Sequence, residues 1–383
     1  MKPQNLKAVI VGAGWAGEGH TKALQYCGVK VAAICARKQE VVDKVASNLD
    51  IEIASTNWQQ TLEKVKPDIV ALATPAILRT PVFELAVELG AHILCDKPLA
   101  NTAKEAAHFY HLVNQANVKH AYAATHCYHP SVTWVNQLLS NQSVGNLKQI
   151  DVISSHPKSK ELKSWSWMNS LSHGGGMLNN GFPHWLGILE RMTNRKLSSV
   201  VGQAQQKHER APVLPNVHDF RQFRDTKISP QDATNMEWRI CDGESSFSAL
   251  MKLSLPNSQR EKENVVPVMM RVTSGIAESV ETNGWYFYGD EGTLIGRGGM
   301  LSLSLSKTEN SQTSSLAIPE ALTNDLPQVG DIIQNMWVAL VIDFIADICN
   351  QPHQSYLTFR DVWRYQVAIE AIRQGTGSNQ IAK

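Results

Sequence analysis

The chain has 383 residues, more than the roughly 250–300 at which a single hydrophobic core stops growing, so two domains are expected. With 43% hydrophobic and 19% charged residues it has a globular composition, which excludes wholesale disorder, collagen and coiled coils. The 36 Lys and Arg residues nearly cancel the 35 Asp and Glu residues. The formal net charge of +1 therefore gives no basic footprint for nucleic acid or for an anionic membrane.

Cysteine usage and hydropathy predict the compartment. The six cysteines stand singly, without a C-x-x-C pair, which in a chain of this size is typical of reduced thiols. No stretch reaches the about 18 uncharged apolar residues that a membrane span needs. The apolar residues 8–11 run into a glycine turn, which suits a strand better than a signal peptide. We expect a cytoplasmic protein without nucleic-acid or membrane partners.

The first 125 residues alternate strand and helix signals. Short apolar runs predict strands at 6–11, 29–35, 68–74, 91–95 and 120–125. The segments between them predict helices at 17–26, 39–49, 82–89 and 102–117. Strands separated by helices of this length imply right-handed crossovers and a parallel sheet. Residues 1–125 are therefore predicted to form a doubly wound Rossmann domain of the α/β class.

Beyond residue 145 strands follow one another with few helices between them. They are expected at 148–154, 198–203, 236–241, 246–253, 265–273, 285–288 and 300–306. The last of these alternates apolar and polar residues, as in a sheet with one face in water. Helices are expected at 331–348 and 359–373, and loops at 206–230 and 257–264. Residues 126–383 are thus predicted to form an α+β domain with a large, mostly antiparallel open sheet and C-terminal helices that pack back.

A G-x-G-x-x-G motif, Gly12, Gly14 and Gly17 around Trp15 and Ala16, joins the first strand to the first helix. The first glycine permits a tight turn, the second lets the backbone approach a pyrophosphate, and the third lets helix and strand pack closely. The phosphates then meet unpaired N–H groups at the helix N-terminus. In this setting the motif predicts dinucleotide binding, with an unliganded glycine-rich turn as the alternative.

The end of the second strand decides between the two nicotinamide cofactors. An NAD-preferring site usually has an Asp or Glu there, which binds the ribose hydroxyls. This sequence has Ala36, Arg37 and Lys38, and its first acid is Glu40. A missing carboxylate beside two cations favours the 2′-phosphate of NADP, with NAD as the second choice. The alternative is that Arg37 and Lys38 are ordinary solvated residues.

Several motifs resemble those of one oxidoreductase family. They are residues 68–75, Asp96-Lys97-Pro98 within 91–100, Tyr128-His129-Pro130, Trp167 ahead of 174–178, His184, Asp232, 289–294 and the helix at 359–373. Over nearly its whole length the chain is similar to the glucose–fructose oxidoreductase, inositol dehydrogenase and rhizopine-catabolism family. The resemblance implies an NAD(P)-dependent dehydrogenase or reductase in which Thr74, Pro75 and Asp96 lie at the cofactor. It also implies a homodimer or homotetramer formed through the C-terminal sheet.

Lys97 and His184 are the candidate proton-handling residues. Lys97 follows a parallel strand at the edge where doubly wound sheets bind ligands, and it can hold both the cofactor ribose and a substrate hydroxyl. Partial burial would lower its pKa, and Pro98 restricts its backbone toward extended geometry. His184 is the candidate proton acceptor because an imidazole titrates in the right range. The alternatives are a surface lysine and a core or capping histidine.

Asn180 departs from the family, which has an aspartate four residues before its histidine on the same helical face. An asparagine can hydrogen-bond a substrate or orient His184, but it cannot take up a proton. Pro183 is incompatible with a helix interior, so we expect a helix that starts at Asn179 or Asn180 with Pro183 in its first turn. Asn180 as a simple N-cap is the alternative.

The substrate wall is less well marked. His126 and Tyr128 are expected at a strand end that faces the cleft, and Trp165 is a candidate for packing on a sugar face, with core packing as the alternative. The His126/His129 and His108/His111 pairs lack a third ligand at a diagnostic spacing, so no metal site is predicted.

These observations predict hydride transfer between a nicotinamide and a hydroxyl- or carbonyl-bearing carbon of a sugar, cyclitol or related polyol. Lys97, Asn180 and His184 are the predicted catalytic residues, with Asn180, His184, His126, Tyr128 and Trp165 at the substrate. Two alternatives stay open. One is a redox-assisted glycosidase or dehydratase that recycles its cofactor, and the other is a non-catalytic dinucleotide-binding regulator.

Overall fold

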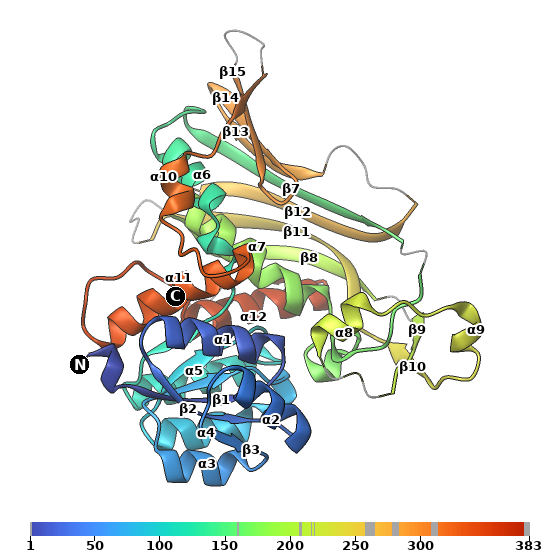
Figure 1. Cartoon of the computed structure of the whole chain (residues 1–383). Helices are drawn as coiled ribbons and strands as arrows, with labels where there is room; N and C mark the ends of the chain where they lie inside the picture. Colours follow the sequence, from blue (N-terminus) through green and yellow to red (C-terminus); the bar gives the residue numbers. More distant parts are fainter. Residues whose placement is uncertain are drawn as a thin grey trace.

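The computed structural model describes residues 2–158, 161–206, 209–215, 217, 219–256, 265–277, 283–307 and 313–378. The loop expected at 257–264 lies outside them. Two sheets organise the described residues, with helices between them (Figure 1). In Figure 1 the N-terminal sheet lies at the bottom and the large C-terminal sheet at the top.

The N-terminal sheet has six parallel strands in the order β3-β2-β1-β4-β5-β6. They are β1 (Lys7–Val11), β2 (Lys30–Cys35), β3 (Ile53–Ser55), β4 (Ile69–Leu72), β5 (His92–Cys95) and β6 (His120–Tyr122). The connecting helices are α1 (Trp15–Tyr26), α2 (Gln39–Asn48), α3 (Trp58–Val65), α4 (Thr80–Glu88) and α5 (Ala103–Gln115). All of β4 is buried, as expected for a strand covered on both faces. The predicted Rossmann fold is confirmed.

The strand order reverses between β1 and β4. From β1 the chain first builds outward through β2 and β3, and it then returns to place β4 on the other side of β1. Open α/β sheets bind their ligands in the crevice at the carboxyl ends of the strands at such a switch point. The glycine turn follows β1, and Thr74 follows β4. The topology therefore brings these two motifs to one edge of the sheet.

The C-terminal sheet has nine strands in the described residues, in the order β16-β15-β14-β13-β7-β12-β11-β8-β17. They are β7 (Leu147–Pro157), β8 (Lys196–Gln206), β11 (Glu244–Ser254), β12 (Val265–Ile276), β13 (Gly284–Gly289), β14 (Gly292–Arg297), β15 (Ser302–Lys307), β16 (Thr313–Leu316) and β17 (Gly377–Ser378). Only the β7–β12 pair is parallel; the other pairs are antiparallel. The predicted α+β domain with a mostly antiparallel sheet is confirmed.

The helices of the second half pack on this sheet, on the N-terminal domain or in a side arm. They are α6 (Pro130–Ser140), α7 (Met177–Thr193), α8 (Phe220–Asp225), α9 (Pro230–Ala233), α10 (Glu320–Asn324), α11 (Ile332–Ile348) and α12 (Phe359–Gln374). α7 and α12 pack on β8 and β11, while α12 also packs on α5. No helix among the described residues has the length and apolar character required for a membrane span.

α11 belongs to the second half of the chain but completes the core of the N-terminal domain. Its Trp337 ring lies so close to Gly19 that a Cβ on this glycine would come within 1.9 Å of the ring. The same ring lies 4.8 Å, between centroids, from Trp15. Val341 and Phe344 are fully buried in one cluster with Leu24 of α1. Figure 1 shows α11 and α12 between the two sheets.

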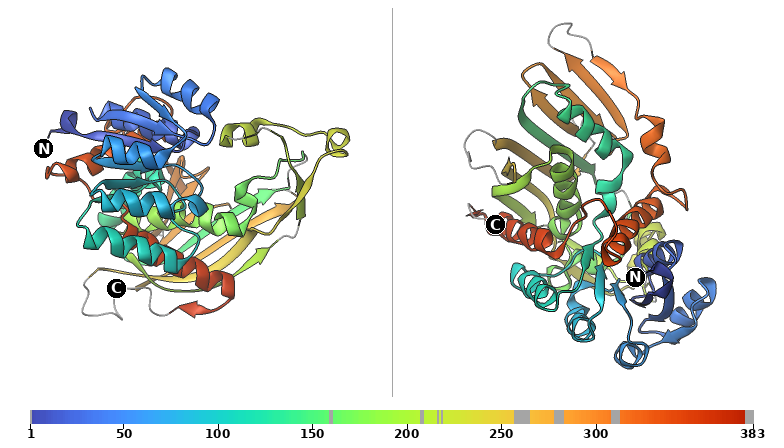
Figure 2. Two further views of the ribbon diagram at one scale, coloured as in Figure 1. Left: turned by 90° about the horizontal axis from the view of Figure 1, so that it is seen from below. Right: turned by 90° about the vertical axis from the view of Figure 1, so that its left-hand side faces the viewer.

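A side arm leaves the C-terminal domain between β8 and β11. It contains a two-stranded ribbon of β9 (Glu209–Pro212) and β10 (Trp238–Cys241), together with α8 and α9. The expectation that 206–230 is a loop is therefore wrong for β9 and α8. In Figures 1 and 2 the α8 end of this arm lies beside the N-terminal domain.

Candidate active site

The glycine turn has the geometry of a dinucleotide cradle. Gly12 has a φ of 117°, and a Cβ there would lie 2.6 Å from the backbone of Ala73. A Cβ on Gly17 would lie 1.8 Å from the carbonyl oxygen of Gly12. Both positions therefore require glycine. Gly14 is the N-cap of α1 and has no side chain of its own to cap the helix, so the turn fits a pyrophosphate.

The predicted ribose-binding residues lie next to this turn. The N–H of Gly12 donates to the carbonyl of Cys35 at 2.8 Å, which holds the end of β2 against the turn. Ala36, Arg37 and Lys38 follow directly, and the side chains of Arg37 and Lys38 are exposed. The structure thus places both predicted cations at the carboxyl edge of the sheet, beside the glycine turn.

The residues after β4 and β5 form the other side of the site. Thr74 and Pro75 follow β4, and the Thr74 hydroxyl is buried without a hydrogen-bond partner in the described part of the chain. Asp96 follows β5, with a carboxylate oxygen 3.5 Å from Nε2 of the buried His20. Burial would raise the pKa of Asp96, but His20 and then Lys97 lower it below its usual value. The unpartnered Thr74 hydroxyl is consistent with a ligand at this edge.

Arg79, which was not predicted from the sequence, joins these two strand ends through hydrogen bonds. The side chain is only 1% exposed. Its guanidinium donates to the carbonyl of Thr74 at 2.8 Å and to that of Asp96 at 2.6 Å, and it also binds the carbonyl of Pro98. The sequence does contain a signal for it. Arg79 is a single cation directly after the apolar residues 76–78, shortly past the end of a predicted strand.

α7 starts at Met177 with Gly176 as its N-cap, so the expected start at Asn179 or Asn180 is wrong. The cause is the buried Glu244, whose carboxylate accepts the N–H of Leu178 at 3.0 Å and caps the helix from outside. Pro183 consequently lies inside the helix rather than in its first turn. Asn180 is not the cap, because both its backbone N–H and its side-chain amide donate to the carbonyl of Gly176.

Lys97, Asn180, His184 and His126 come together in the structure. Lys97 Nζ donates to Oδ1 of Asn180 at 3.3 Å. His184 lies one helical turn after Asn180, and its ring stacks on that of His126 with centroids 4.1 Å apart. Nδ1 of His184 is buried without a hydrogen-bond partner among the described residues. Three segments far apart in the sequence thus supply one cluster, which we call the Lys97 cluster.

The surroundings lower the pKa values of two residues in this cluster, Lys97 and His184. Burial is the main cause that lowers the pKa of Lys97; Asp96 opposes this shift and the Arg79 cation adds to it. Burial, followed by the charges of His126 and Lys97, lowers the pKa of His184 well below its usual 6.5. His184 is therefore neutral at neutral pH and can accept a proton.

Tyr128 and Trp165 contact other parts of the molecule. The Tyr128 hydroxyl donates to Asp343 of α11 at 3.0 Å. Trp165 Nε1 donates to the carbonyl of Ile240 in β10 at 3.1 Å, and the Arg239 guanidinium lies 5.1 Å from the centre of the Trp165 ring. None of these contacts involves the Lys97 cluster. Of the predicted substrate-wall residues His126, Tyr128 and Trp165, His126 is the one that contacts this cluster, through its stacking on His184.

One contact at the glycine turn was not expected from the sequence. The carboxylate of Asp219, on the side arm, accepts the N–H of Trp15 at 2.8 Å. Arg221 binds this carboxylate and also Glu18 of α1. Both arm residues fall in the polar stretch that was expected to be a loop, where no periodicity marks them.

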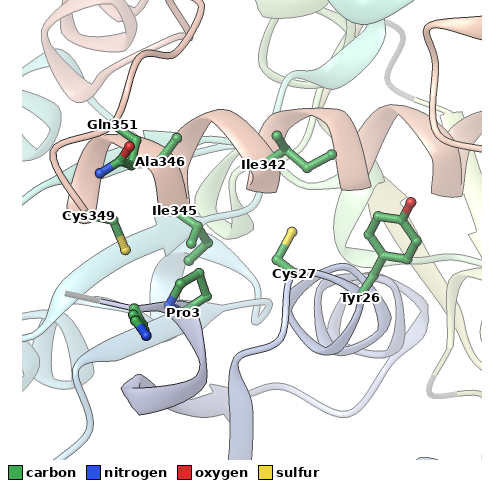
Figure 3. A pocket seen from close by; sticks show the side chains of 9 residues that line it. Pro3, Tyr26, Cys27, Ile342, Ile345, Ala346, Cys349 and Gln351 are labelled. Atoms are coloured by element: carbon green, nitrogen blue, oxygen red, sulfur yellow. The ribbon is translucent and has the colours of Figure 1, made fainter.

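Two further observations concern other kinds of site. No three His, Cys, Asp or Glu side chains of the described ranges gather in a way that could hold a metal ion. An apolar pocket lies between the first residues, the end of α1 and α11 (Figure 3), and none of the predicted site residues lines it. It is lined by Lys2, Pro3, Tyr26, Cys27, Ile342, Ile345, Ala346, Cys349 and Gln351.

Comparison with known proteins agrees with the geometry. Residues 6–124 match the model of the oxidoreductase family with an NAD-binding Rossmann fold. An uncharacterized oxidoreductase of a Synechocystis species is 24% identical over 298 residues, which cover 77% of this chain and 72% of that protein. Levoglucosan dehydrogenase of Pseudarthrobacter phenanthrenivorans is 25% identical over 190 residues, 45% of this chain and 48% of that protein.

A solved structure extends the likeness to the whole fold. Levoglucosan dehydrogenase in complex with NADH and L-sorbose superposes with a TM-score of 0.77 at 18% identity, over 99% of this chain and 100% of that one. The match therefore includes the large C-terminal sheet as well as the Rossmann domain. The family model matches the Rossmann part of the chain, residues 6–124, so this part is similar to the glucose–fructose oxidoreductase, inositol dehydrogenase and rhizopine-catabolism family of oxidoreductases.

Proposed function

We propose that this protein is an NAD(P)-dependent dehydrogenase or reductase that acts on a hydroxyl- or carbonyl-bearing carbon of a sugar, cyclitol or related polyol. The observation that carries the proposal is the Lys97 cluster, in which Lys97, Asn180 and His184 meet at the carboxyl edge of a sheet with a glycine turn. The name of levoglucosan dehydrogenase, a similar protein, supports a sugar-like substrate.

The cofactor would be held along this edge. Gly12, Gly14, Trp15, Ala16 and Gly17 would bind the pyrophosphate through backbone N–H groups. We propose a preference for NADP over NAD, because the exposed cations after β2 suit a 2′-phosphate. The residues for the ribose and nicotinamide ends are Ala36, Arg37, Lys38, Thr74, Pro75, Asp96 and Lys97. When bound, the nicotinamide supplies the acceptor or donor of the hydride at its C4 carbon.

The chain's own residues handle the proton. In the oxidation direction, the substrate hydroxyl gives its proton to the neutral imidazole of His184 as its carbon loses the hydride. Lys97 donates a hydrogen bond to the same substrate oxygen, and Asn180 Oδ1 holds the Lys97 amine in place. Because an amide cannot accept the proton, the proton goes to His184. In the reduction direction, protonated His184 returns the proton to the new alkoxide.

Binding and turnover measured separately test this function. NADPH and NADH are titrated by fluorescence, with tighter NADPH binding expected; tighter NADH binding would contradict the NADP preference. Turnover with a panel of polyols and sugars is then followed through the absorbance of the reduced nicotinamide. Product without net change in cofactor would indicate redox-assisted cleavage or dehydration. Binding without turnover or recycling on any sugar, polyol or open-chain carbonyl would indicate a regulator.

We also propose how the chain is organised and assembled. Residues 1–125 form the dinucleotide domain, and residues 126–383 form the substrate and oligomerisation domain. Val201, Leu250 and Met269 are cross-strand neighbours on the outer face of β8, β11 and β12, and they are 47%, 59% and 38% exposed. This apolar row, which we call the outer row, supports a homodimer or homotetramer formed through the sheet. The six free cysteines support a reducing, cytoplasmic location.

A further inference from the structure

The side arm places a charged segment of the C-terminal domain on the glycine turn. Asp219 is the N-cap of α8 and Arg221 lies in its first turn. Both contact α1, more than 200 positions earlier in the sequence. In Figure 1 the α8 end of the arm lies next to the N-terminal domain.

Asp219 occupies the position of an anion at the N-terminus of α1. Its Oδ2 accepts the N–H of Trp15, the first residue of the helix, at 2.8 Å. The same oxygen lies 3.5 Å from the position that a Cβ on Gly14 would take. A dinucleotide pyrophosphate binds these N–H groups and approaches this glycine. A carboxylate oxygen of Asp219 thus stands where a phosphate oxygen would bind, and the two cannot be present together.

Arg221 completes the shell around this anion. Its Nε and its backbone N–H each donate to Asp219 Oδ1 at 2.8 Å, and Nη2 donates to Oδ2 at 3.0 Å. The guanidinium also donates to both oxygens of Glu18, at 2.7 and 3.1 Å. Because Glu18 belongs to α1, this second pair fixes Arg221 to the N-terminal domain independently of Asp219.

Asp219 carries its charge at neutral pH. Burial would raise its pKa, but hydrogen bonds from Arg221 and from the N–H of Trp15 outweigh that effect and lower the pKa below 3.8. An ionised carboxylate and a phosphate are both bound by a guanidinium and by helix N-terminal N–H groups. The shell therefore suits either anion.

We infer that Arg221 is a cofactor-binding residue, and that Asp219 is an internal competitor which the cofactor pyrophosphate displaces. On displacement the Asp219 carboxylate turns to solvent, while Arg221, still held by Glu18, donates to the pyrophosphate. No covalent bond changes; one anion replaces another in the same shell. This inference rests on the proposed dinucleotide binding and adds to it a ligand from the C-terminal domain.

An internal anion that occupies the pyrophosphate site lowers the apparent affinity for the cofactor. Only those molecules in which the anion has left the site can bind the cofactor. Asp219→Asn removes the charge but keeps an acceptor, and asparagine is a favoured N-cap, so α8 is retained. We expect full-length Asp219→Asn to bind ADP about three- to tenfold more tightly than the wild type. Adenosine, which has no phosphate, should bind both equally. Isothermal titration with the two ligands measures this difference, and equal ADP affinity in both proteins would overturn the role of Asp219.

Arg221 is tested in the Asp219→Asn background, where it can no longer act by holding Asp219. We expect Asp219→Asn/Arg221→Gln to bind ADP about tenfold more weakly than Asp219→Asn, because a charge-assisted hydrogen bond is lost. Adenosine binding should again stay the same. Unchanged ADP binding would reduce Arg221 to a support for Asp219 and overturn its role as a ligand.

The control is Lys227→Gln, which removes an exposed cation of the same arm that pairs with Glu161. It should leave ADP binding unchanged, and thermal unfolding of each variant checks that the fold is retained. Failure of the proposed function gives a different result from failure of this inference. If no protein of the series, the wild type included, binds NADH or NADPH, dinucleotide binding itself is refuted. If all bind equally well, only the roles of Asp219 and Arg221 are refuted.

Discussion

Asn180 gives the Lys97 cluster its particular charge balance. An amide oxygen, rather than a carboxylate, receives the hydrogen bond from Lys97 Nζ. Two imidazoles and an amine therefore share a partly buried space, and the Asp96 carboxylate opposes the lowering of the Lys97 pKa. Burial and the neighbouring cations lower the pKa values of Lys97 and His184, so the His184 imidazole is neutral at neutral pH and keeps a lone pair for a proton.

A carboxylate at position 180 should reverse that balance. In Asn180→Asp a negative charge would lie beside Lys97 and one helical turn from His184, and it would raise both pKa values because it favours their protonated forms. His184 then needs a higher pH to be neutral. We expect the acid limb of the kcat/KM profile for alcohol oxidation to move to higher pH. An Asn180→Ala control keeps the site uncharged, and an unshifted limb in Asn180→Asp would contradict this account.

His184 should be needed for chemistry but not for cofactor binding. His184→Gln keeps a polar side chain of similar length but cannot take up the proton. We expect kcat to fall by about 10²–10⁴, the usual contribution of a general base. NADPH affinity, from fluorescence titration, should stay within about twofold of the wild type because the pyrophosphate shell is unchanged. Full turnover in His184→Gln would refute the role of His184.

At the scale of elements, strands were predicted correctly where their burial produces a short apolar run in the sequence. β1, β2, β4 and β5 are short and almost entirely buried, so their apolar runs give their bounds to within two residues. β3, at the sheet edge, is only half-buried, and α3 buries two residues of eight. These two elements lack a clear apolar pattern and were not predicted from the sequence.

The site elements show a second limit. The start of α7 depends on Glu244, 66 residues away from Leu178, and the shell on the glycine turn depends on Asp219, 204 residues away from Trp15. No local pattern encodes such contacts. The glycine turn, Lys97 and His184 could be predicted because their motifs are contiguous, or because the family resemblance carries them. Arg79, Asp219 and Arg221 become visible only when the chain is folded.

His120 joins β6 to the start of α12 and should make this junction sensitive to acid. Its Nδ1 accepts the N–H of Phe359 at 3.1 Å, and its ring stacks on that of Phe359. Burial lowers its pKa to about 4 from 6.5, so below pH 6.5 the unfolded chain binds a proton that the folded chain does not. The contribution of His120 to the free energy of unfolding is therefore complete above pH 6.5, and it is lost as the pH falls toward 4.

His120→Asn keeps an acceptor but does not titrate. Urea unfolding at pH 7, 5.5 and 4 should show a smaller loss of unfolding free energy in the variant than in the wild type, by at most about 3 kcal/mol. The remaining histidines titrate equally in both proteins, so the difference between the two curves isolates His120. Parallel curves would show that the junction tolerates the charge.

At the scale of the whole molecule, the nine-stranded sheet has one face covered by helices and one face that carries the outer row. Along β11 the side chains alternate, with Phe247, Ala249 and Met251 buried and Leu250 59% exposed between them. Leu250 pairs with Val201 on one side and Met269 on the other. An apolar row across three adjacent strands is unusual on a surface that faces only water.

Leu250→Glu should therefore dissociate the assembly. Light scattering after size-exclusion chromatography should give a dimer or tetramer for the wild type and a smaller species for the variant, because a charge buried in an apolar interface has no partner. Ile240→Glu, an equally exposed apolar position on the side arm, is the control and should assemble as the wild type does. A monomeric wild type would refute assembly through this sheet.

The packing of Trp337 on Gly19 has a consequence for how the protein folds during its synthesis. Synthesis at about 5–20 residues per second separates residue 125 from α11 by roughly 10–40 s. During that interval α1 has its glycine turn but lacks the residues of α11 that bury Leu24 and cover Gly19. A nascent Rossmann half would expose apolar surface to the cell and attract chaperones. The core around the glycine turn is therefore completed only when α11 has been synthesised, long after residues 12–17 themselves.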